Sequence, residues 1–246
     1  SDVKARPEDQ LALLTLQERD NHITQLNHAR KNIAEQAELA EVTASLREFS
    51  QSLIAAQGVL EDAKIELARI EDDVRVVDER IAKDKEREAG AASAKDLQAL
   101  EAELASLATR KSNLEDIELV VMQSIEDAEV AVADVLVERD AVEARRAALA
   151  QAVSTREAEI DAELAAETAA RTELAASLPA DLVELYERQR ARYGIGAALL
   201  TRRVTGGSGV ELTSTDLDAV RAAAPDDVVI CPDSSCILVR TNESGL

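Results

Sequence analysis

The two cysteines of this 246-residue chain lie near its carboxyl end, in the stretch Cys231-Pro-Asp-Ser-Ser-Cys236. Zinc knuckles usually hold two thiols separated by two residues, whereas four residues separate this pair. A structural zinc site needs four nitrogen or sulfur donors, and both histidines, His22 and His28, lie far away near the amino end. These side chains cannot complete such a site within one chain. We therefore expect no bound metal and no other cofactor.

Two other kinds of chemistry are open to the cysteines. A disulfide between Cys231 and Cys236 can form if the turn between them brings the sulfurs together, although a reducing cytoplasm disfavours it. A catalytic thiol needs a nearby base, and no histidine lies in this part of the chain. Buried or half-exposed free thiols are therefore the favoured interpretation.

The remaining reactive residue types do not form a recognisable catalytic pattern. His22 and His28 are six residues apart, so they do not share one face of a helix as metal ligands would. Gly206, Gly207 and Gly209 lack the spacing and the following lysine of a phosphate-binding loop. We identify no catalytic residue and expect a protein that is not an enzyme.

Composition points to long helices as the elements that carry these residues. The chain is 46% hydrophobic and 31% charged, yet it has one Phe, two Tyr and no Trp, which is typical of a coiled coil. Between Pro7 and Pro179 there is no proline and only two glycines, Gly58 and Gly90, whereas six of the eight glycines follow Tyr193. The predicted fold is mainly α: a long antiparallel helical hairpin (coiled coil) with a small C-terminal α+β, zinc-ribbon-like domain.

Apolar residues in the first part of the chain repeat every three or four positions, which is a heptad pattern. The first series is Leu39, Val42, Leu46, Phe49, Leu53, Ala56, Leu60, Ala63, Leu67, Ile70, Val74, Val77 and Ile81. A second series runs from Leu97 to Ile160. Between them, Gly90 can end one helix, and Ser93 with Asp96 three residues later forms a capping box for the next.

These series predict two helices that pack antiparallel, with facing seam residues whose numbers sum to 181. We assign residues 8–178 to the coiled-coil hairpin, with its tip near 86–95, and residues 179–246 to the C-terminal domain, called the head below. Upstream of Leu39 the apolar residues fall in a shifted phase, which predicts a change of packing there.

Short apolar stretches in the head predict strands. They lie at residues 195–200, 210–212, 228–230 and 237–239. A helix capped by Ser214 or Thr215 is expected to run through Ala223. Because so few elements make a small core, we expect the head to depend on packing against the helices for its stability.

Three stretches resemble a bacterial family of coiled-coil proteins with a C-terminal C4-type zinc ribbon domain. They are Leu178-Pro-Ala-Asp-Leu-Val-Glu-Leu-Tyr-Glu-Arg188, Lys95-Asp-Leu-Gln-Ala-Leu100 and Val228-Val-Ile-Cys-Pro-Asp-Ser-Ser-Cys-Ile-Leu-Val-Arg240. The resemblance implies a long helical hairpin followed by a small ribbon. It also implies a role in nucleic-acid binding, or as an adaptor or chaperone for protein partners.

The ribbon of this chain departs from the family pattern, in which the second knuckle reads C-P-x-C-G-x-I-L. On that pattern Cys231 takes the third ligand position, Ser234 takes the fourth, and Cys236 falls where no ligand belongs. The first knuckle falls in a stretch without thiols, with Val204 and Ser208 at its degenerate positions. The resemblance therefore implies a degenerate ribbon that lacks most of the ligand cysteines.

Charge is shared unevenly along the chain. Of the net charge of −21, residues 1–179 carry 21 basic against 39 acidic side chains, which disfavours nucleic acid along the helices. Residues 188–203 are basic, in contrast to the acidic helices. The candidate contacts in and beside this stretch are five arginines and two tyrosines: Arg188, Arg190, Arg192, Arg202, Arg203, Tyr186 and Tyr193. They suit phosphates or an acidic partner surface, or alternatively pair with the acidic base of the hairpin.

Aliphatic side chains outside the seam suggest a second contact surface. Ile54, Ile65 and Val76 recur every 11 residues, which keeps them on one outer face, and Val120, Val130 and Val137 are similarly displaced on the second helix. Such a stripe suits a homodimer or a partner helix, although scattered exposed aliphatics are also normal.

The function that these features favour is a non-enzymatic adaptor that binds protein partners through the hairpin and the head. The alternative is a nucleic-acid-binding regulator that uses residues 188–203. No run of about 18 uncharged apolar residues and no signal-peptide pattern is present, so we expect a cytoplasmic protein without a membrane partner.

Overall fold

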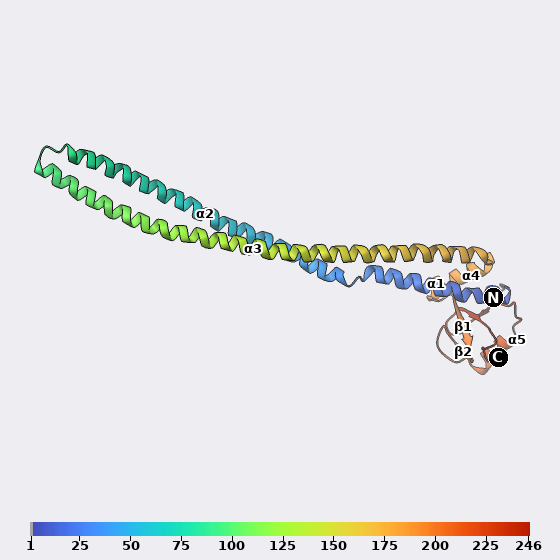
Figure 1. Ribbon diagram of the computed structural model, residues 1–246. Coiled ribbons are helices and arrows are strands. Elements are labelled where there is room, and N and C mark those ends of the chain that lie inside the picture. Colours follow the sequence, from blue (N-terminus) through green and yellow to red (C-terminus); the bar gives the residue numbers. More distant parts are fainter. Residues whose placement is uncertain (1) are drawn as a thin grey trace. The chain divides into compact units, whose positions relative to one another are not determined.

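A computed structural model describes residues 2–246 (Figure 1). The chain divides into two compact units. One contains the residues up to Ala34 together with Ala152–Leu246, and the other contains Glu35–Gln151. The expected boundary between hairpin and head, at residues 178 and 179, thus lies inside the first of these units.

The structure is mainly helical, and the expected fold class is confirmed. The helices are α1 (Pro7–Lys31), α2 (Glu35–Ala89), α3 (Ala94–Ser177), α4 (Ala180–Tyr193) and α5 (Ser214–Ala222). The strands are β1 (Ala197–Thr201), β2 (Val204–Thr205), β3 (Val229–Ile230) and β4 (Ile237–Val239). None of the helices in the described part of the chain is long and apolar enough to cross a membrane.

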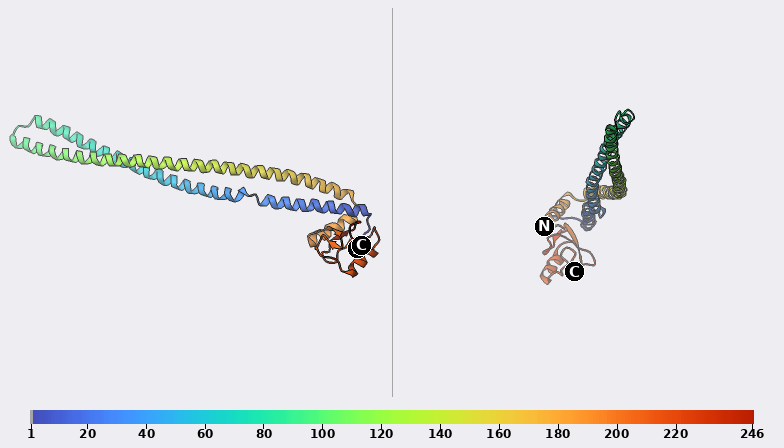
Figure 2. Two further views of the ribbon diagram at one scale, coloured as in Figure 1. Left: turned by 60° about the horizontal axis from the view of Figure 1, so that its bottom comes forward. Right: turned by 90° about the vertical axis from the view of Figure 1, so that its left-hand side faces the viewer.

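Helices α2 and α3 run antiparallel and are joined by a short turn at the expected tip (Figure 2). The backbone N–H of Gly90 donates to the carbonyl of Arg87 at 3.2 Å as α2 ends. The Ser93 hydroxyl then accepts the backbone N–H of Asp96 at 3.2 Å and caps α3. The turn therefore uses the glycine and the capping serine that the sequence indicates.

The predicted seam is the face along which α2 and α3 pack. Every residue of the first heptad series is buried or half-buried, and Ile70 is only 2% exposed. Three ion pairs among the described residues connect the helices: Arg80 with Glu103 at 2.6 Å, Arg145 with Glu38 at 2.7 Å and Lys111 with Asp78 at 2.6 Å. The residue numbers sum to 183 in the two arginine pairs and to 189 in the lysine pair, against 181 in the predicted register.

One seam position near the tip carries an acid. Asp84 is 1% exposed, and its Oδ2 has no hydrogen-bond partner among the described residues. Its other oxygen lies 3.7 Å from the guanidinium of Arg87. The seam is therefore interrupted by a buried carboxylate that is only weakly compensated.

The shifted phase upstream of Leu39 corresponds to a break in the helix. Helix α1 ends at Lys31, Asn32 leaves the helical conformation with φ −127°, and α2 begins at Glu35. Ile33, within the break, is 6% exposed. The apolar pattern changes phase because the chain leaves the helix at this point.

The head contains one four-stranded sheet in the order β2-β1-β4-β3. Strands β1 and β4 are parallel, and the two outer pairs are antiparallel. On one face, Ile237 and Val239 share a core with Leu13 of α1 and Leu182 of α4. On the other face, Leu238 shares a second core with residues of α5. Side chains of α1, which lies outside the head, thus help to form one of the two cores of the head.

Two local predictions in the head were wrong. Residues 210–212 do not form a strand, because only an isolated bridge joins Glu211 to Val204. Helix α5 is capped by Thr213, whose hydroxyl accepts the backbone N–H of Asp216 at 3.2 Å, rather than by Ser214 or Thr215. Three consecutive hydroxyl residues make the capping position ambiguous in the sequence.

Candidate functional site

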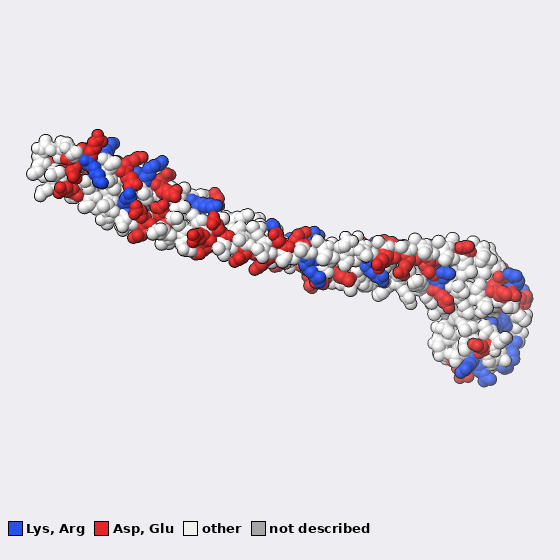
Figure 3. Space-filling model, viewed as in Figure 1, with Lys and Arg blue, Asp and Glu red and all other residues white. Residues whose placement is uncertain are grey.

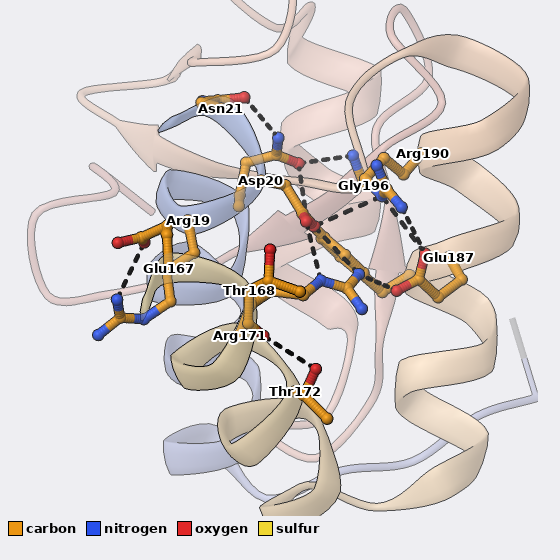
Figure 4. Close-up of polar contacts among 12 residues, drawn as sticks. Arg19, Asp20, Asn21, Glu167, Thr168, Arg171, Thr172, Glu187, Arg190 and Gly196 are labelled. Carbon is orange, nitrogen blue, oxygen red and sulfur yellow. Dashed lines mark hydrogen bonds and ion pairs between the residues drawn. The ribbon is translucent and has the colours of Figure 1, made fainter. Parts of the chain in front are cut away.

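A buried polar network lies where α1, α3 and α4 meet (Figure 4). The hydroxyl of Tyr186, which is fully buried, donates to Oδ2 of Asp20 at 2.6 Å. Asp20 also accepts the Nε–H of Arg171 at 2.8 Å and forms an ion pair with Arg190 at 3.4 Å. Both arginines also contact Glu187. Two acids and two arginines are thus mutually neutralised around one tyrosine.

The same network reaches the sheet through Gln17 and Gly196. Oε1 of Gln17 accepts the backbone N–H of Gly196 at 2.8 Å, just before β1. A side chain at Gly196 would place its Cβ 2.4 Å from Cε2 of Tyr186, far closer than two carbons can approach. Glycine is therefore required so that the backbone can lie against the tyrosine ring.

Protonation states in the network follow from burial and pairing. Burial, and then the hydrogen bond to Asp20, raise the pKa of Tyr186. Burial also acts to raise the pKa of Glu187, but hydrogen bonds from Arg171 and Arg190 outweigh it and lower that pKa. The tyrosine stays protonated and the glutamate stays ionised, so the network joins elements and holds no free acid or base.

The structure divides the predicted basic contacts between two roles. Tyr186 and Arg190 belong to the buried network, so for Arg190 the alternative of pairing with the acidic base of the hairpin is the one observed. Arg188 is exposed, and its side chain has no hydrogen bond or ion pair to another described residue. Arg192 is exposed and lies over the ring of Tyr193, 5.4 Å from its centroid.

Arg202 and Arg203 form the two-residue turn between β1 and β2. Both are exposed, with left-handed φ values of 49° and 67°. Their backbone N–H groups donate to the carbonyls of Glu243 and Ser244 at 2.9 and 2.8 Å. The conformation is costly for residues other than glycine, and these hydrogen bonds to the C-terminal segment stabilise it. The turn leaves both arginine side chains at the surface.

The two cysteines lie together in the core under α5, and both are 0% exposed. The backbone N–H of Cys231 donates to the carbonyl of Cys236 at 2.8 Å and closes the β3–β4 hairpin. The Sγ of Cys236 lies 3.1 Å from the Ser234 hydroxyl, and the Sγ of Cys231 lies 3.5 Å from the Thr205 hydroxyl. The sulfurs are thus surrounded by hydroxyl groups within an otherwise apolar core.

Neither residue assigned to the degenerate first knuckle, Val204 or Ser208, contacts a cysteine in the described part of the chain. Val204 is exposed, whereas its neighbour Thr205 is fully buried and faces Cys231. Ser208 is exposed and its hydroxyl accepts the backbone N–H of Val210 at 3.3 Å. The two residues of the β1–β2 turn set this register, because they fix which side chain of β2 points inward.

The donor set around the cysteines does not suit a structural zinc ion. It consists of two thiols and neutral hydroxyls, and no group of three His, Cys, Asp or Glu side chains within residues 2–246 is placed to hold a metal. Burial acts to raise the pKa of Cys231, but hydrogen bonds from Ser234 and Thr205 outweigh it and lower that pKa. Burial raises the pKa of Cys236.

Both histidines lie on α1 at exposed positions. Nδ1 of His22 is 3.4 Å from a carboxylate oxygen of Glu167, and His28 lies beside Asn32. Neither histidine belongs to a metal-binding group among the described residues.

The off-seam aliphatic residues are strongly exposed on the unit Glu35–Gln151. The exposed fractions are 70% for Ile54, 59% for Ile65, 59% for Val76, 67% for Val120, 59% for Val130 and 69% for Val137. On the face shown in Figure 3, charged and uncharged side chains alternate along the helices. The exposure of these aliphatic side chains is what their positions outside the heptad seam predict.

Several residues that organise the head were not identified from the sequence. Gln17, Asp20, Arg171 and Gly196 were missed because they are distant in the sequence and meet only after folding. The one local signal was Asp20, an acid in phase with the buried Leu13 and Leu16 of α1. Arg240 was also missed, although its guanidinium binds the carbonyls of Ala223, Ala224 and Asp227 at 2.7–3.0 Å beyond the end of α5.

Comparison with known proteins agrees with the hairpin architecture. Residues 16–194 match the family described as the CT398-like coiled coil hairpin domain, so the match includes α4 and ends before β1. Over 242 residues the chain is 34% identical to an uncharacterized protein of Mycobacterium tuberculosis, covering 97% of this chain and 98% of that protein.

Two solved structures share the fold. A protein from Mycobacterium smegmatis is 34% identical with a TM-score of 0.83, covering 97% of this chain and all of that chain. CT398 from Chlamydia trachomatis is 21% identical with a TM-score of 0.62, covering 94% of this chain and 97% of that chain, and it shows similarity of fold alone. By the match over residues 16–194, this protein belongs to the CT398-like coiled-coil hairpin family.

Proposed function

We propose that the protein is a non-enzymatic adaptor that binds protein partners through the surface of its helical hairpin and through its head. The observation that carries the proposal is the set of exposed aliphatic side chains at Ile54, Ile65 and Val76. Their spacing of 11 residues keeps them aligned along one outer face of α2, where they do not contribute to the seam. A partner helix would remove these side chains from water, which is the main favourable term in association.

The arrangement of ionisable groups supports an adaptor over an enzyme. The acids and arginines around Tyr186 neutralise one another, and the two cysteines are buried. An enzyme places reactive groups in a concave pocket with a free acid, base or nucleophile. Charged residues of α2 and α3 instead lie mostly at the surface, some of them in ion pairs such as Arg80 with Glu103.

Partner capture with the full-length chain tests this proposal. The hairpin variant carries Ile54→Ser, Ile65→Ser and Val76→Ser, which removes exposed aliphatic groups and leaves the seam unchanged. The matched control carries Ser for Ala55, Lys64 and Arg75, which are exposed neighbours on the same helix. We expect proteins captured by the native chain and by the control to be lost from the hairpin variant. Equal capture by all three chains would contradict the use of this face.

The second candidate function is nucleic-acid binding through the head, favoured by the exposed Arg202 and Arg203 at the β1–β2 turn. Arginine pairs well with phosphate, and a left-handed turn of two arginines is a costly way to build an ordinary hairpin. The excess of acidic side chains elsewhere opposes it. A salt-dependent mobility shift that Arg202→Glu with Arg203→Glu abolishes would support this function, and no shift at low salt would exclude it.

A further inference from the structure

Cys231 and Cys236 occupy directly opposed positions at the closed end of the β3–β4 hairpin. The strand register pairs Ile230 with Ile237, and the next pair is Cys231 with Cys236, joined by a backbone hydrogen bond of 2.8 Å. Side chains of directly opposed residues lie on the same face of a sheet. Cα atoms of a hydrogen-bonded pair are about 5.5 Å apart, within the range of about 4.4–6.8 Å that a disulfide spans.

The surroundings of the two sulfurs differ. The thiol of Cys231 donates to the Thr205 hydroxyl at 3.5 Å. Burial acts to raise the pKa of Cys231, but hydrogen bonding with Ser234, Thr205 and the nearby backbone outweighs it and lowers that pKa. Once the thiol proton is lost, these hydroxyl and backbone groups can donate to the sulfur. These donors stabilise a thiolate at Cys231 despite its burial. Cys236 lies against Ser234 at 3.1 Å and beside Cys231. Cys231 is therefore the better nucleophile, and Cys236 is the adjacent thiol that can react next.

Small residues cover one side of the pair. Gly207 lies next to the cysteines, where a Cβ would be 2.4 Å from the Ser234 hydroxyl oxygen and 2.9 Å from the Cys236 sulfur. Gly207 and Ser234 are both partly exposed. A glycine and a serine thus lie over the Cys236 sulfur on this side, while both cysteines also belong to the apolar core with Leu217 and Val220.

We propose that Cys231 and Cys236 are a site of reversible thiol oxidation by a peroxide, with an intramolecular disulfide as the product. The Cys231 thiolate attacks one peroxide oxygen, the O–O bond breaks, and the other oxygen leaves with a proton as water. The thiolate of Cys236 then attacks the sulfenic sulfur, the S–O bond breaks, and hydroxide leaves and is protonated to water. In sum, two thiols lose two electrons and two protons, and hydrogen peroxide is reduced to two waters.

This site does not depend on the proposed adaptor function. The sequence left the disulfide open on the condition that the turn between the cysteines brings the sulfurs together. The turn required by that condition is present: residues 232–235 turn tightly, Ser235 adopts φ 60°, and its N–H donates to the Cys231 carbonyl at 3.0 Å. Both cysteine side chains lie in the same core.

Peroxide treatment of the native full-length chain tests the site. The reduced chain is exposed to hydrogen peroxide, quenched, alkylated and analysed by intact-mass and peptide mass spectrometry. We expect the mass to fall by two hydrogens, both thiols to become unreactive, a 231–236 cross-link to appear, and dithiothreitol to reverse all three changes. Two free thiols under conditions that fully oxidise the denatured chain would overturn the proposal, as would disulfides that form only between chains.

Three variants separate the roles of the groups. Cys236→Ser is expected to accumulate sulfenic acid at Cys231, trapped by dimedone. Cys231→Ser is expected to react about tenfold more slowly, because the remaining thiol has fewer donors to stabilise its thiolate. Thr205→Val retains both cysteines but removes the hydroxyl beside Cys231. Slower oxidation by peroxide in this variant is expected if the hydroxyl stabilises the thiolate, and it is not expected if Thr205 only fills space. Thermal unfolding of each reduced variant verifies its fold. If a cysteine variant fails to fold, the cross-link in the native chain and the oxidation rate of Thr205→Val still test the proposed thiol oxidation.

Discussion

Removal of the Asp20 carboxylate is the most direct test of the buried network. Asp20 is 6% exposed and receives the Tyr186 hydroxyl at 2.6 Å and the Arg171 Nε–H at 2.8 Å. Breaking a buried charge pair from one side typically costs about 3–5 kcal/mol, because the partner charge is left uncompensated. Arg171 retains Glu187, which places the Asp20→Ala cost near the lower limit, at about 3 kcal/mol.

Equilibrium urea unfolding followed by circular dichroism measures this loss. With a slope of about 2 kcal/mol per molar urea, the midpoint of the unit that contains α1, α4 and the sheet should fall by about 1.5 M. Hydrogen exchange of peptides from α4 and β1 should increase with it, since both elements depend on the network. The control is Asp161→Ala, which removes a carboxylate from the exposed ion pair with Arg30 and should change little.

A double-mutant cycle with Tyr186→Phe identifies the interaction itself. Tyr186→Phe alone removes one hydrogen bond to a charged group and should cost about 1.5–3 kcal/mol. Because the two residues share this bond, the double variant should be less destabilised than the sum of the single variants. A cost below about 1 kcal/mol for Asp20→Ala, or strictly additive costs, would refute the assignment of this network as the tie between helices and sheet.

Four further outcomes are expected. Gly196→Ala should destabilise the same unit by about 1–3 kcal/mol, because its Cβ meets the Tyr186 ring, and a native urea midpoint would contradict this. Asp84→Leu should raise the urea midpoint of the hairpin unit, since it replaces a poorly compensated buried carboxylate with a seam residue, and a lowered midpoint would show that Asp84 has a partner. Arg240→Met should increase hydrogen exchange in α5, because four backbone carbonyls lose their donor, whereas Arg221→Met on the exposed face should not. The pKa of Tyr186 is raised in the folded chain, so its contribution to the free energy of unfolding is complete below a pH of about 10 and is lost above it. Urea midpoints measured from pH 9 to 11 should therefore fall more in the native chain than in Tyr186→Phe.

The helical hairpin could be predicted from the sequence because its signals are local and repeated. The heptad spacing identifies the buried face, and Gly90 with Ser93 marks where the chain reverses. Each of these features depends on residues a few positions apart in one helix. The change of packing upstream of Leu39 was detectable for the same reason, although the break in the helix itself was not predicted.

The candidate sites depend on contacts that no local pattern encodes. Asp20, Arg171 and Tyr186 are far apart in the chain, and only the packing of three helices shows that they form one network. For the same reason the sequence did not indicate that Arg190 would be engaged in an internal ion pair while Arg188, two residues away, remains exposed.

Taken alone, the sequence determined a mainly helical chain, a hairpin with a defined tip, a set of aliphatic residues outside the seam, and the lack of enough donors for a zinc site. Only the tertiary structure decided which residues share the cores of the head, that Thr205 and not Val204 faces Cys231, and that the two cysteines lie side by side. The physical reason is that periodicity reports which face of an element is buried, whereas the partner of a buried group is set by the packing of elements distant in the sequence.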